Sequence, residues 1–244
     1  MIKTIEELSL NGWAPQQTML YDGWVIRFAN GYTKRANSVN PLYSSSIDLE
    51  EKLRFCESLY QAKNLPVVFK MTSEVYPNDL DDRLDEWGYQ KDSLTSVQTV
   101  DLDVGDLQIS STVRLQENLS DDWFRSFCAM SAISDAHRET LRKILTNIVP
   151  RHCFLSLTSD GRVVACGLGV LQSGYIGLFD IVTDPDFRRR GYGQQAVTSI
   201  LAWGKENQAR TAYLQVMLNN PPALQLYANL GFREQYQYWY RIKL

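Results

Sequence analysis

The 244-residue sequence has few of the side chains that usually hold a metal ion. It contains only two histidines, His137 and His152, and four cysteines that lie far apart in apolar surroundings. Zinc-binding sequences instead place cysteine and histidine in pairs a few residues apart. We therefore expect no metal site, and we expect the four cysteines to be buried, reduced thiols.

The sequence also lacks a long apolar run and an excess of positive charge. Its first residues, MIKTIEELSLNGW, have no apolar core of the kind found in signal peptides, and no run is long enough to span a membrane. The formal net charge is −3, which disfavours nucleic acid as the main partner. The sequence thus predicts a cytoplasmic protein that binds neither a membrane nor nucleic acid.

A strand, a glycine-containing loop and the start of a helix follow one another from residue 176 onwards. Residues 176–182 form an apolar, β-branched run, and Asp-Pro-Asp at 184–186 ends it. Three arginines and two glycines follow within 188–193, before a helical pattern that begins near Gln194. Free backbone N–H groups at a helix start, a glycine-containing loop and basic side chains together favour binding of a phosphate.

Two other interpretations of this loop are weaker. Gly191-x-Gly193-x-x-Ala196 also fits a dinucleotide-binding pattern, but the next predicted strand ends in Asn-Asn-Pro-Pro at 219–222, without the acidic residue that would hold a ribose. A solvated basic patch would explain the three arginines, but not their position between a strand and a helix. The sequence therefore favours a phosphate site that is not of the dinucleotide type.

A second motif lies downstream of the loop. It reads NxxAxxLYxxxGF and covers residues 220–232. Together with RxxGxG at 188–193, and in the same order, it resembles the acetyl-CoA-binding motifs of the GNAT superfamily of N-acetyltransferases. The resemblance covers residues 113–244. It implies an α/β fold with a mixed sheet, the GNAT-like acyl-CoA N-acyltransferase fold.

Residues 1–105 show a weaker version of the same pattern. Their predicted elements have the same order as those near the end of the chain: helix, strand, helix, a short aromatic or apolar motif with a central glycine, and strand. The motif is Trp-Gly-Tyr at 87–89 in the first half and Leu-Gly-Phe at 230–232 near the end. No RxxGxG motif occurs before residue 105. We therefore predict a degenerate GNAT-like domain over 1–105, a linker at 101–111 and a complete GNAT acetyltransferase domain over 112–244. The first half is not expected to bind the cofactor; it can shape the acceptor pocket or form a homodimer contact.

Periodicity and turn signals predict the individual elements. In the first half we expect helices at 2–10, 48–63 and 77–87, strands at 23–28, 66–71 and 88–102, and a partner strand for 23–28 at 32–39. In the second half we expect strands at 113–115, 153–157, 163–171 and 175–183 and helices at 120–130 and 136–148. Asp48, Ser120 and Asn220 are placed to cap helices.

The resemblance assigns the cofactor, acetyl-CoA, to three groups of residues. Main-chain groups of Ile181, Val182 and Thr183 would bind the pantetheine arm and offer an N–H to the thioester oxygen. The pyrophosphate would lie on the loop made of Arg188, Arg189, Arg190, Gly191, Tyr192 and Gly193. Asn220 would contact the cofactor arm beside the small Ala223. The alternatives are a fully paired core strand at 181–183 and a purely structural N-cap at Asn220.

Two residues are candidates for catalysis. The resemblance assigns Tyr227 as the general acid that protonates the departing sulfur; the alternative is a packed core tyrosine. Asp180 lies within an apolar strand, which predicts a raised pKa and makes it the candidate base; the alternative is a hydrogen-bonded structural carboxylate. Glu117, Asp135 and His137, in the segment that forms the acceptor side in the family, are further candidates for the base.

These features predict an acyltransferase that transfers the acetyl group of acetyl-CoA to a primary amine of a small molecule or peptide, without a metal. Acidic residues near the expected acceptor side favour a cationic amine; they are Asp121, Asp122, Asp135 and Glu139. The alternative is a non-catalytic regulatory protein that binds CoA or acetyl-CoA. The intact Tyr227 favours the enzyme, because a sensor has no need of an acid at the sulfur.

Overall fold

The computed structural model describes residues 1–103 and 107–243. The first half contributes α1 (Ile2–Gly12), β1 (Gln17–Tyr21), β2 (Trp24–Phe28), η1 (Lys34–Ala36), β3 (Val39–Pro41), α2 (Leu49–Gln61), β4 (Val67–Met71), α3 (Leu80–Glu86) and β5 (Gln90–Asp101). The second half contributes β6 (Val113–Gln116), α4 (Asp121–Met130), α5 (Asp135–Thr146), β7 (Arg151–Ser159), β8 (Arg162–Gln172), β9 (Tyr175–Thr183), η2 (Pro185–Phe187), α6 (Tyr192–Glu206), β10 (Thr211–Met217), α7 (Pro221–Asn229) and β11 (Arg233–Lys243).

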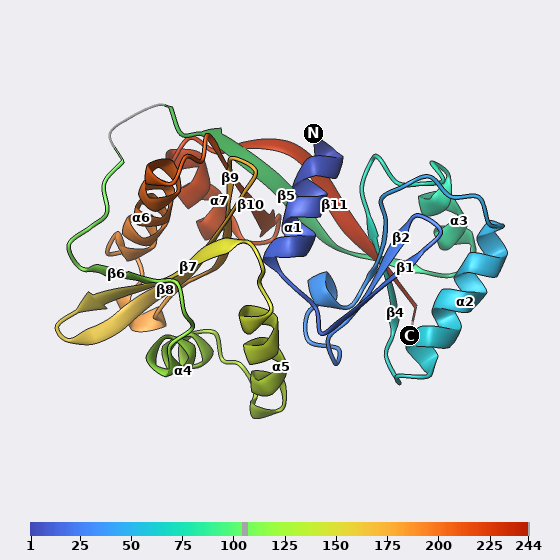
Figure 1. Cartoon of the computed structure of the whole chain (residues 1–244), viewed down its shortest axis with the longest axis horizontal. Helices are drawn as coiled ribbons and strands as arrows, with labels where there is room; N and C mark the ends of the chain where they lie inside the picture. The colour runs from blue at the N-terminus through green and yellow to red at the C-terminus, as the bar shows by residue number, and fades with distance from the viewer. Residues whose placement is uncertain (104–106, 244) are drawn as a thin grey trace.

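The strands form one mixed sheet that runs through the whole molecule (Figure 1). Within the described residues it has eleven strands, in the order β1-β2-β3-β4-β11-β5-β10-β9-β8-β7-β6. Parallel pairs are β3 with β4 and β9 with β10, and the other neighbours are antiparallel. The predicted α/β fold with a mixed sheet is confirmed.

The last strand of each half lies within the sheet of the other. β5 pairs with β10 on one side and with β11 on the other, so that Val97 lies opposite both Gln215 and Tyr236. β11 in turn pairs with β4, where Trp239 lies opposite Met71. Each half is therefore completed by a strand from the other half. The division into domains at 1–105 and 112–244 stays a prediction, and residues 104–106 of the expected linker lie outside the described residues.

The predicted partner strand at residues 32–39 is wrong for most of its length. The neighbours of β2 are β1 and the short β3, and η1 occupies the segment expected to be extended. The Asn37 side-chain amide explains the difference. Its oxygen accepts from the N–H groups of Ala29 and Gly31, and its nitrogen donates to carbonyls of the same turn, so these groups are satisfied locally instead of in a ladder.

Most of the other predicted elements are present, with shifted ends. α3 begins at Leu80 instead of 77, and α6 begins at Tyr192 instead of 194. The three predicted caps are confirmed, because the side chains of Asp48, Ser120 and Asn220 each accept a hydrogen bond from a backbone N–H in the first turn of the helix. β1 was not predicted, because most of its residues are exposed and give no alternating pattern.

The two faces of the sheet in the second half carry different helices. α6 and α7 pack on one face, around Leu178, Leu214 and Ile200. α1, α4 and α5 pack on the other face, around Phe179, Tyr213 and Trp123. The four cysteines are buried thiols, as expected. A third cluster joins α2 and α3 to the sheet of the first half.

None of the helices in the described residues is both long enough and apolar enough to cross a membrane. Residues 1–103 and 107–243 contain no group of three or more His, Cys, Asp or Glu side chains placed to hold a metal ion.

Candidate active site

β9 and β10 are parallel neighbours for only part of their length. Residues 211–214 of β10 pair with residues 175–178 of β9, although β10 continues to Met217 and β9 to Thr183. On its other side β9 stays paired with β8 as far as Thr183. The strands thus separate, and the β10-facing edge of residues 179–183 is not part of a ladder. Backbone N–H and C=O groups on such an edge need partners, which a bound ligand can supply.

Asp180 lies in a β-bulge at the point where β9 leaves β10. The register between β8 and β9 shifts there, so that Asp180 and Ile181 together face Gly167. Asp180 has a φ of 51°, which turns the strand locally. A Cβ on Gly167 would lie 2.8 Å from the Ile181 side chain, so the glycine makes room for the bulge.

The Asp180 carboxyl is the most unusual titratable group of this region. Its Oδ2 is buried and has no hydrogen-bond partner among the described residues. Burial raises the pKa of Asp180 to about 7, and the positive charge of Arg35 opposes the rise. A carboxylate of this kind can accept a proton near neutral pH, as the apolar flanks in the sequence predicted.

The loop before α6 presents backbone N–H groups at the end of β9. Gly191 is the N-cap of α6, with a φ of 83° that few other residues adopt. The first bond of the helix runs from the Gln195 N–H to the Gly191 carbonyl, so the N–H groups of residues 192–194 have no intrahelical partner. A Cβ on Gly193 would contact Thr183 and Leu226, at 3.4 and 3.5 Å, which places the loop between β9 and α7.

The three arginines of this loop are exposed. Arg188 donates from Nε to the Thr183 carbonyl at 3.3 Å, and the Arg190 guanidinium lies 5.0 Å from the centre of the Phe187 ring. Tyr192 points elsewhere, because its hydroxyl donates to Ser159 at 2.9 Å. The helix N-terminus and the arginines together form a positive region that suits a phosphate.

α7 lies next to the α6 loop, because Leu226 is close to Gly193, and it carries Tyr227. Asn220 accepts a bond from the Ala223 N–H at 3.3 Å and so caps the helix, with Pro221 at its first position. Tyr227 is 8 % exposed and contacts Phe232. Burial raises the pKa of Tyr227 to about 12, so its hydroxyl keeps its proton at neutral pH. Within residues 1–103 and 107–243 this hydroxyl makes no hydrogen bond.

Comparison with known proteins agrees with this geometry. Residues 1–241 match a family model described as "Probable histone acetyltransferase Rv0428c C-terminal". The chain belongs to this family. It is therefore an acyltransferase of the GNAT type, and both the resemblance to tandem GNAT proteins and the enzyme class are confirmed.

Individual relatives carry similar names. The chain is 29% identical to the uncharacterized N-acetyltransferase YobR of Bacillus subtilis, over 99% of this chain and 98% of that protein. A segment of 84 residues is 34% identical to the [ribosomal protein bS18]-alanine N-acetyltransferase of Salmonella typhimurium, and covers 34% of this chain and 57% of that protein.

Two solved structures have the same fold over nearly the whole chain. A GCN5-related N-acetyltransferase from Kribbella flavida superposes with a TM-score of 0.70 at 16% identity, over 99% of this chain and 95% of the other. A tandem GNAT protein from the clavulanic acid biosynthesis pathway superposes with a TM-score of 0.64 at 12% identity, over 98% of this chain and 87% of the other.

In this GNAT protein the other candidate bases lie on the surface or at the rim. Glu117 pairs with Arg151. His137 contacts Tyr32, with ring centroids 5.2 Å apart. The acidic residues expected to attract a cationic amine are all engaged with basic neighbours in exposed ion pairs: Asp121 with Arg142, Asp122 with Arg125, Asp135 with Arg138 and Glu139 with Lys143. The pairs leave no unopposed acidic surface on these helices.

Two residues of the first half reach this site, and the sequence did not indicate either of them. The positive charge of Arg35 partly offsets the rise that burial causes in the pKa values of both Asp180 and Tyr227. The pKa of Tyr32 is raised by burial and by the negative charge of Asp180. The only signal in the sequence was the basic pair at 34–35 just after an Asn-Gly turn, which does not say where the pair lies in space.

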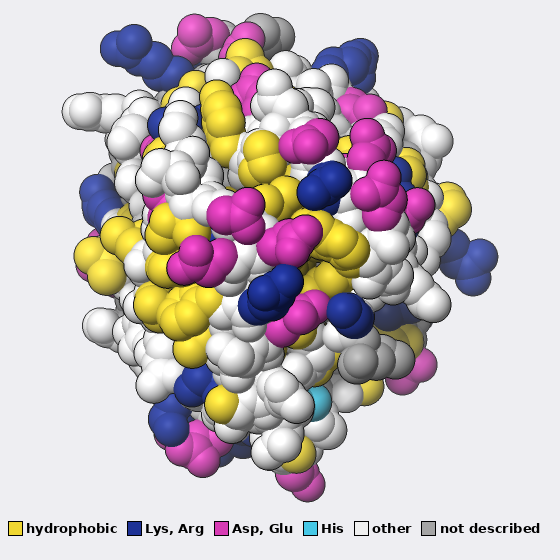
Figure 2. All heavy atoms as spheres, turned by 90° about the vertical axis from the view of Figure 1, so that its right-hand side faces the viewer, with side chains coloured by type: hydrophobic (Ala, Val, Ile, Leu, Met, Phe, Trp, Pro, Cys, Tyr) yellow, Lys and Arg dark blue, Asp and Glu magenta, His cyan; other side chains and the backbone are white. Residues whose placement is uncertain are grey.

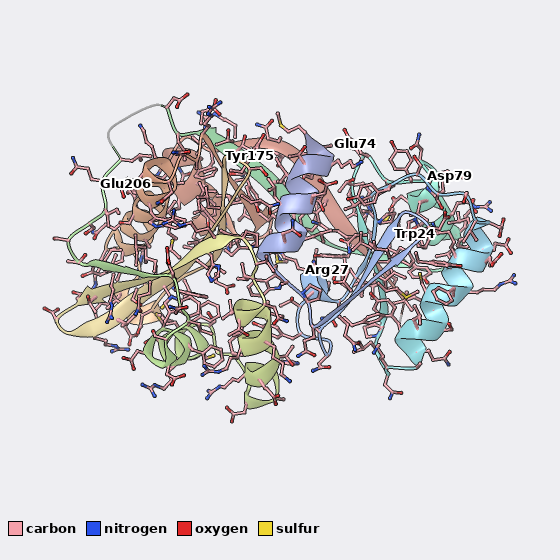
Figure 3. All side chains as sticks on the ribbon, viewed as in Figure 1. Trp24, Arg27, Glu74, Asp79, Tyr175 and Glu206 are labelled. Carbon is pink, nitrogen blue, oxygen red and sulfur yellow. The ribbon has the colours of Figure 1, made fainter. Side chains whose placement is uncertain are left out.

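Arg35 is held by buried side chains on either side. The Arg27 guanidinium, which lies between α1 and the β1–β2 hairpin (Figure 3), donates to the Arg35 carbonyl at 2.6 Å and to the Leu10 carbonyl at 2.9 Å. Arg27 is only 2 % exposed. The Nε of Arg35 donates to the Tyr238 hydroxyl at 3.2 Å. The backbone and the side chain of Arg35 are thus fixed at both ends.

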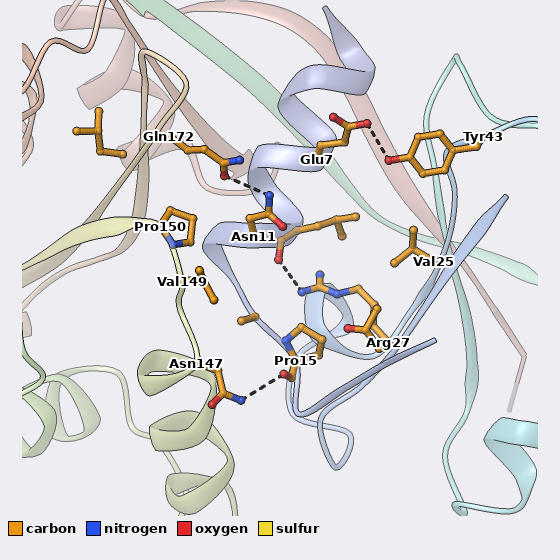
Figure 4. A pocket seen from close by; sticks show the side chains of 14 residues that line it. Glu7, Asn11, Pro15, Val25, Arg27, Tyr43, Asn147, Val149, Pro150 and Gln172 are labelled. Carbon is orange, nitrogen blue, oxygen red and sulfur yellow. Dashed lines mark hydrogen bonds between the residues drawn. The ribbon is translucent and has the colours of Figure 1, made fainter. Parts of the chain in front are cut away.

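A large open cavity lies elsewhere, around the C-terminal end of α1 (Figure 4). It measures about 1020 Å³ and is lined from both halves, by residues such as Arg27, Tyr43, Val149 and Gln172. Hydrogen bonds from Tyr43 to Glu7 and from Asn11 to Gln172 cross it. None of the site residues predicted from the sequence lines it.

The end of the molecule that carries α2 and α3 has a mixed surface (Figure 2). Acidic and basic side chains are interspersed there, with apolar side chains between them. Pairs such as Arg54 with Glu50 and Lys243 with Glu57 are part of this pattern. This face therefore offers no continuous basic surface to nucleic acid.

Proposed function

We propose that the protein transfers an acetyl group from acetyl-CoA to a primary amine of a small molecule or peptide. The observation that carries the proposal is the opening between β9 and β10, where an unpaired strand edge, the N-terminus of α6, a buried carboxyl and a buried phenol meet. Membership of a family of acetyltransferases supports the same reaction.

The residues present fit a thioester of coenzyme A. The N–H groups at 192–194 and the arginines at 188–190 would hold the pyrophosphate. The edge of Ile181, Val182 and Thr183 would hydrogen-bond the amides of the pantetheine arm, with Asn220 and Ala223 on its other side. Acetyl-CoA supplies the activated acetyl group when it is bound. Loss of one well-placed hydrogen-bond donor to an oxyanion raises the barrier by about 2.7–4 kcal/mol, so a backbone N–H at the bulge that reaches the thioester oxygen would lower the barrier by a similar amount.

Asp180 and Tyr227 would move the two protons of the reaction. Asp180 would take a proton from the protonated amine, because an amine attacks a carbonyl only in its neutral form. Tyr227 would hold its proton until the thiolate leaves and would then donate it to the sulfur. The raised pKa of each group, about 7 and about 12, suits these opposite tasks.

We further propose that one half binds the cofactor and that the other contributes to the acceptor side. Residues 112–244 would bind the cofactor, because both motifs lie there, whereas residues 1–105 would form part of the acceptor side through Tyr32 and Arg35.

Release of free CoA thiol in the presence of a panel of primary amines tests the reaction. We expect acetyl-CoA turnover that depends on the amine and a product that is heavier by one acetyl group. Binding of acetyl-CoA without turnover of any amine would contradict the proposal and favour a regulatory protein.

A further inference from the structure

Arg35 is a partly buried cation without an acidic partner. Its Nε is bonded to the Tyr238 hydroxyl, but its terminal nitrogens make no hydrogen bond or ion pair within residues 1–103 and 107–243. A guanidinium has five N–H donors, and an unpaired charge that loses solvent is unfavourable. The terminal nitrogens are not among the buried polar atoms without a partner, so most of the hydrogen-bonding capacity of Arg35 is open to water or to a ligand.

The nearest buried acid on α1 is already engaged. Glu6 accepts from the Lys70 ammonium at 2.5 Å and from the Tyr236 hydroxyl at 2.7 Å. Both of its oxygens are thus occupied. No described hydrogen bond or ion pair joins Glu6 to Arg35.

Hydrogen bonds link Arg35 to the point where β9 and β10 separate, and Asp180 lies on β9 just beyond that point. The Tyr238 hydroxyl donates to Gln215 at 3.1 Å, and Gln215 donates to Ser9 at 2.7 Å. Gln215 is the first residue of β10 beyond its pairing with β9, and Asp180 lies on β9 two residues beyond the last pair. The bonded series of Arg35, Tyr238 and Gln215 therefore ends where the strands separate.

The acid and the cation do not neutralise each other. No described ion pair or hydrogen bond joins Asp180 to Arg35, and the Asp180 Oδ2 is buried without a partner. Two opposite charges held apart by a fixed scaffold match a ligand that itself carries both charges. Arginine is well suited to a carboxylate, because its planar fork can make two parallel hydrogen bonds.

We propose that the acceptor is an amino acid or a similar small amine with a carboxylate, which pairs with Arg35 while the amine lies beside Asp180. This inference rests on the proposed acetyl transfer and adds the chemical class of the acceptor. It also gives the first half a direct role, because Arg35 selects the substrate and the second half transfers the acetyl group.

Matched pairs of acceptors test the inference. We would measure kcat/KM for α-, β- and γ-amino acids and for the corresponding carboxamides, which keep the amine and lose the negative charge. The amine of a carboxamide has the lower pKa and is more often neutral, so intrinsic reactivity favours the amide. A preference of about 10- to 100-fold for the acid, expected for a hydrogen-bonded charge, would therefore reflect recognition.

Variants assign that preference to Arg35. Arg35→Gln should abolish the preference for the acid, whereas Arg35→Lys should keep part of it. Because Arg35 also lowers the pKa values of Asp180 and Tyr227, the result is the ratio of kcat/KM for acid and amide within each variant, and not either value alone. Arg54→Gln removes a charge from the exposed face of α2 and serves as the control, with both substrates unaffected. Thermal unfolding of each variant verifies that it is folded.

The outcomes separate the two proposals. Turnover of amines with no preference for the acid, or equal losses for acid and amide in Arg35→Gln, overturns the acceptor class and leaves acetyl transfer intact. No turnover of any amine overturns the proposed function, and this inference with it.

Discussion

Arg35 donates a hydrogen bond to the Tyr238 hydroxyl, 203 residues further along the chain. This bond joins the beginning of the first half to the last strand of the second half. It is possible because β11 lies between β4 and β5, inside the sheet of the first half. The proposed site between β9 and β10 would therefore be built by both halves, although both motifs of the proposed cofactor site lie in only one.

Activity should depend on pH through Asp180. A carboxyl with a pKa of about 7 must lose its proton to act as a base, so kcat/KM should fall as the pH drops below about 7. Asp180→Asn should lower kcat/KM by about 10²- to 10⁴-fold at pH 8 and remove this part of the profile. Thiol release between pH 5.5 and 9 measures both. An unchanged profile in the variant would mean that another group titrates.

The same substitution should stabilise the protein at high pH. The pKa of Asp180 is raised from 3.8 to about 7 in the folded state, so the unfolded chain loses this proton first. The resulting penalty on folding is absent below about pH 4, grows as the pH rises and is complete above about pH 7. Asp180→Asn should thus raise the unfolding midpoint at pH 8, with a smaller gain at pH 5. A midpoint lowered at pH 8 would show that the carboxylate is instead well paired.

Tyr227→Phe separates binding from catalysis. The variant keeps the ring packed against Phe232 and removes only the hydroxyl. Affinity for acetyl-CoA should change by less than about twofold, while kcat should fall by about 100-fold or more. Calorimetric titration and thiol release measure the two quantities, with the exposed Tyr76→Phe as the control. Full activity of Tyr227→Phe would assign the tyrosine to packing.

The exchange of β5 and β11 should make the halves dependent on each other. In residues 1–105 alone, β5 would lose both of its neighbours, β10 and β11, and in residues 112–244 alone, β11 would lose both of its neighbours, β4 and β5. The last strand of each fragment would thus have no strand to pair with, and the edge of β4 or of β10 would also be exposed. Neither fragment should fold by itself, and the two expressed together should form a complex that unfolds in one transition. Circular dichroism and size-exclusion chromatography decide this. A stable, monomeric fragment 112–244 would contradict the expectation.

The second half could be predicted well because its signals are local. The glycine-containing loop, the cap at Asn220 and the apolar strand around Asp180 each depend on residues within one turn or one strand. These features also locate most of the candidate site. The position of the loop at the end of β9 and of α7 after β10 could be predicted from their order in the chain, because each follows its strand directly.

The contribution of the first half could not be predicted because it depends on contacts distant in the sequence. Arg35 acquires its position from Arg27 and Tyr238, and neither neighbour is implied by a spacing. The predicted strand at 32–39 was wrong for a different reason. The Asn-Gly signal suggested a turn that leads into a strand, but the Asn37 side-chain amide hydrogen-bonds the backbone groups of this turn, so they need no partner strand. No pattern in the sequence indicates that β5 and β11 are exchanged between the two halves.

Binding of acetyl-CoA at the α6 loop is the central claim, and thermal unfolding with two glycine variants tests it most directly. Gly191 and Gly174 both have positive φ, near 83° and 78°, and open space around them, but Gly174 lies at the opposite end of β9. Gly191→Glu and Gly174→Glu therefore add the same charge and similar strain at different places. With acetyl-CoA at 100 times its dissociation constant, the wild type and Gly174→Glu should gain about 2.7 kcal/mol, or about 5–10 °C. Gly191→Glu should gain nothing. An equal gain in both variants would place the cofactor elsewhere, and no gain in the wild type would contradict the account.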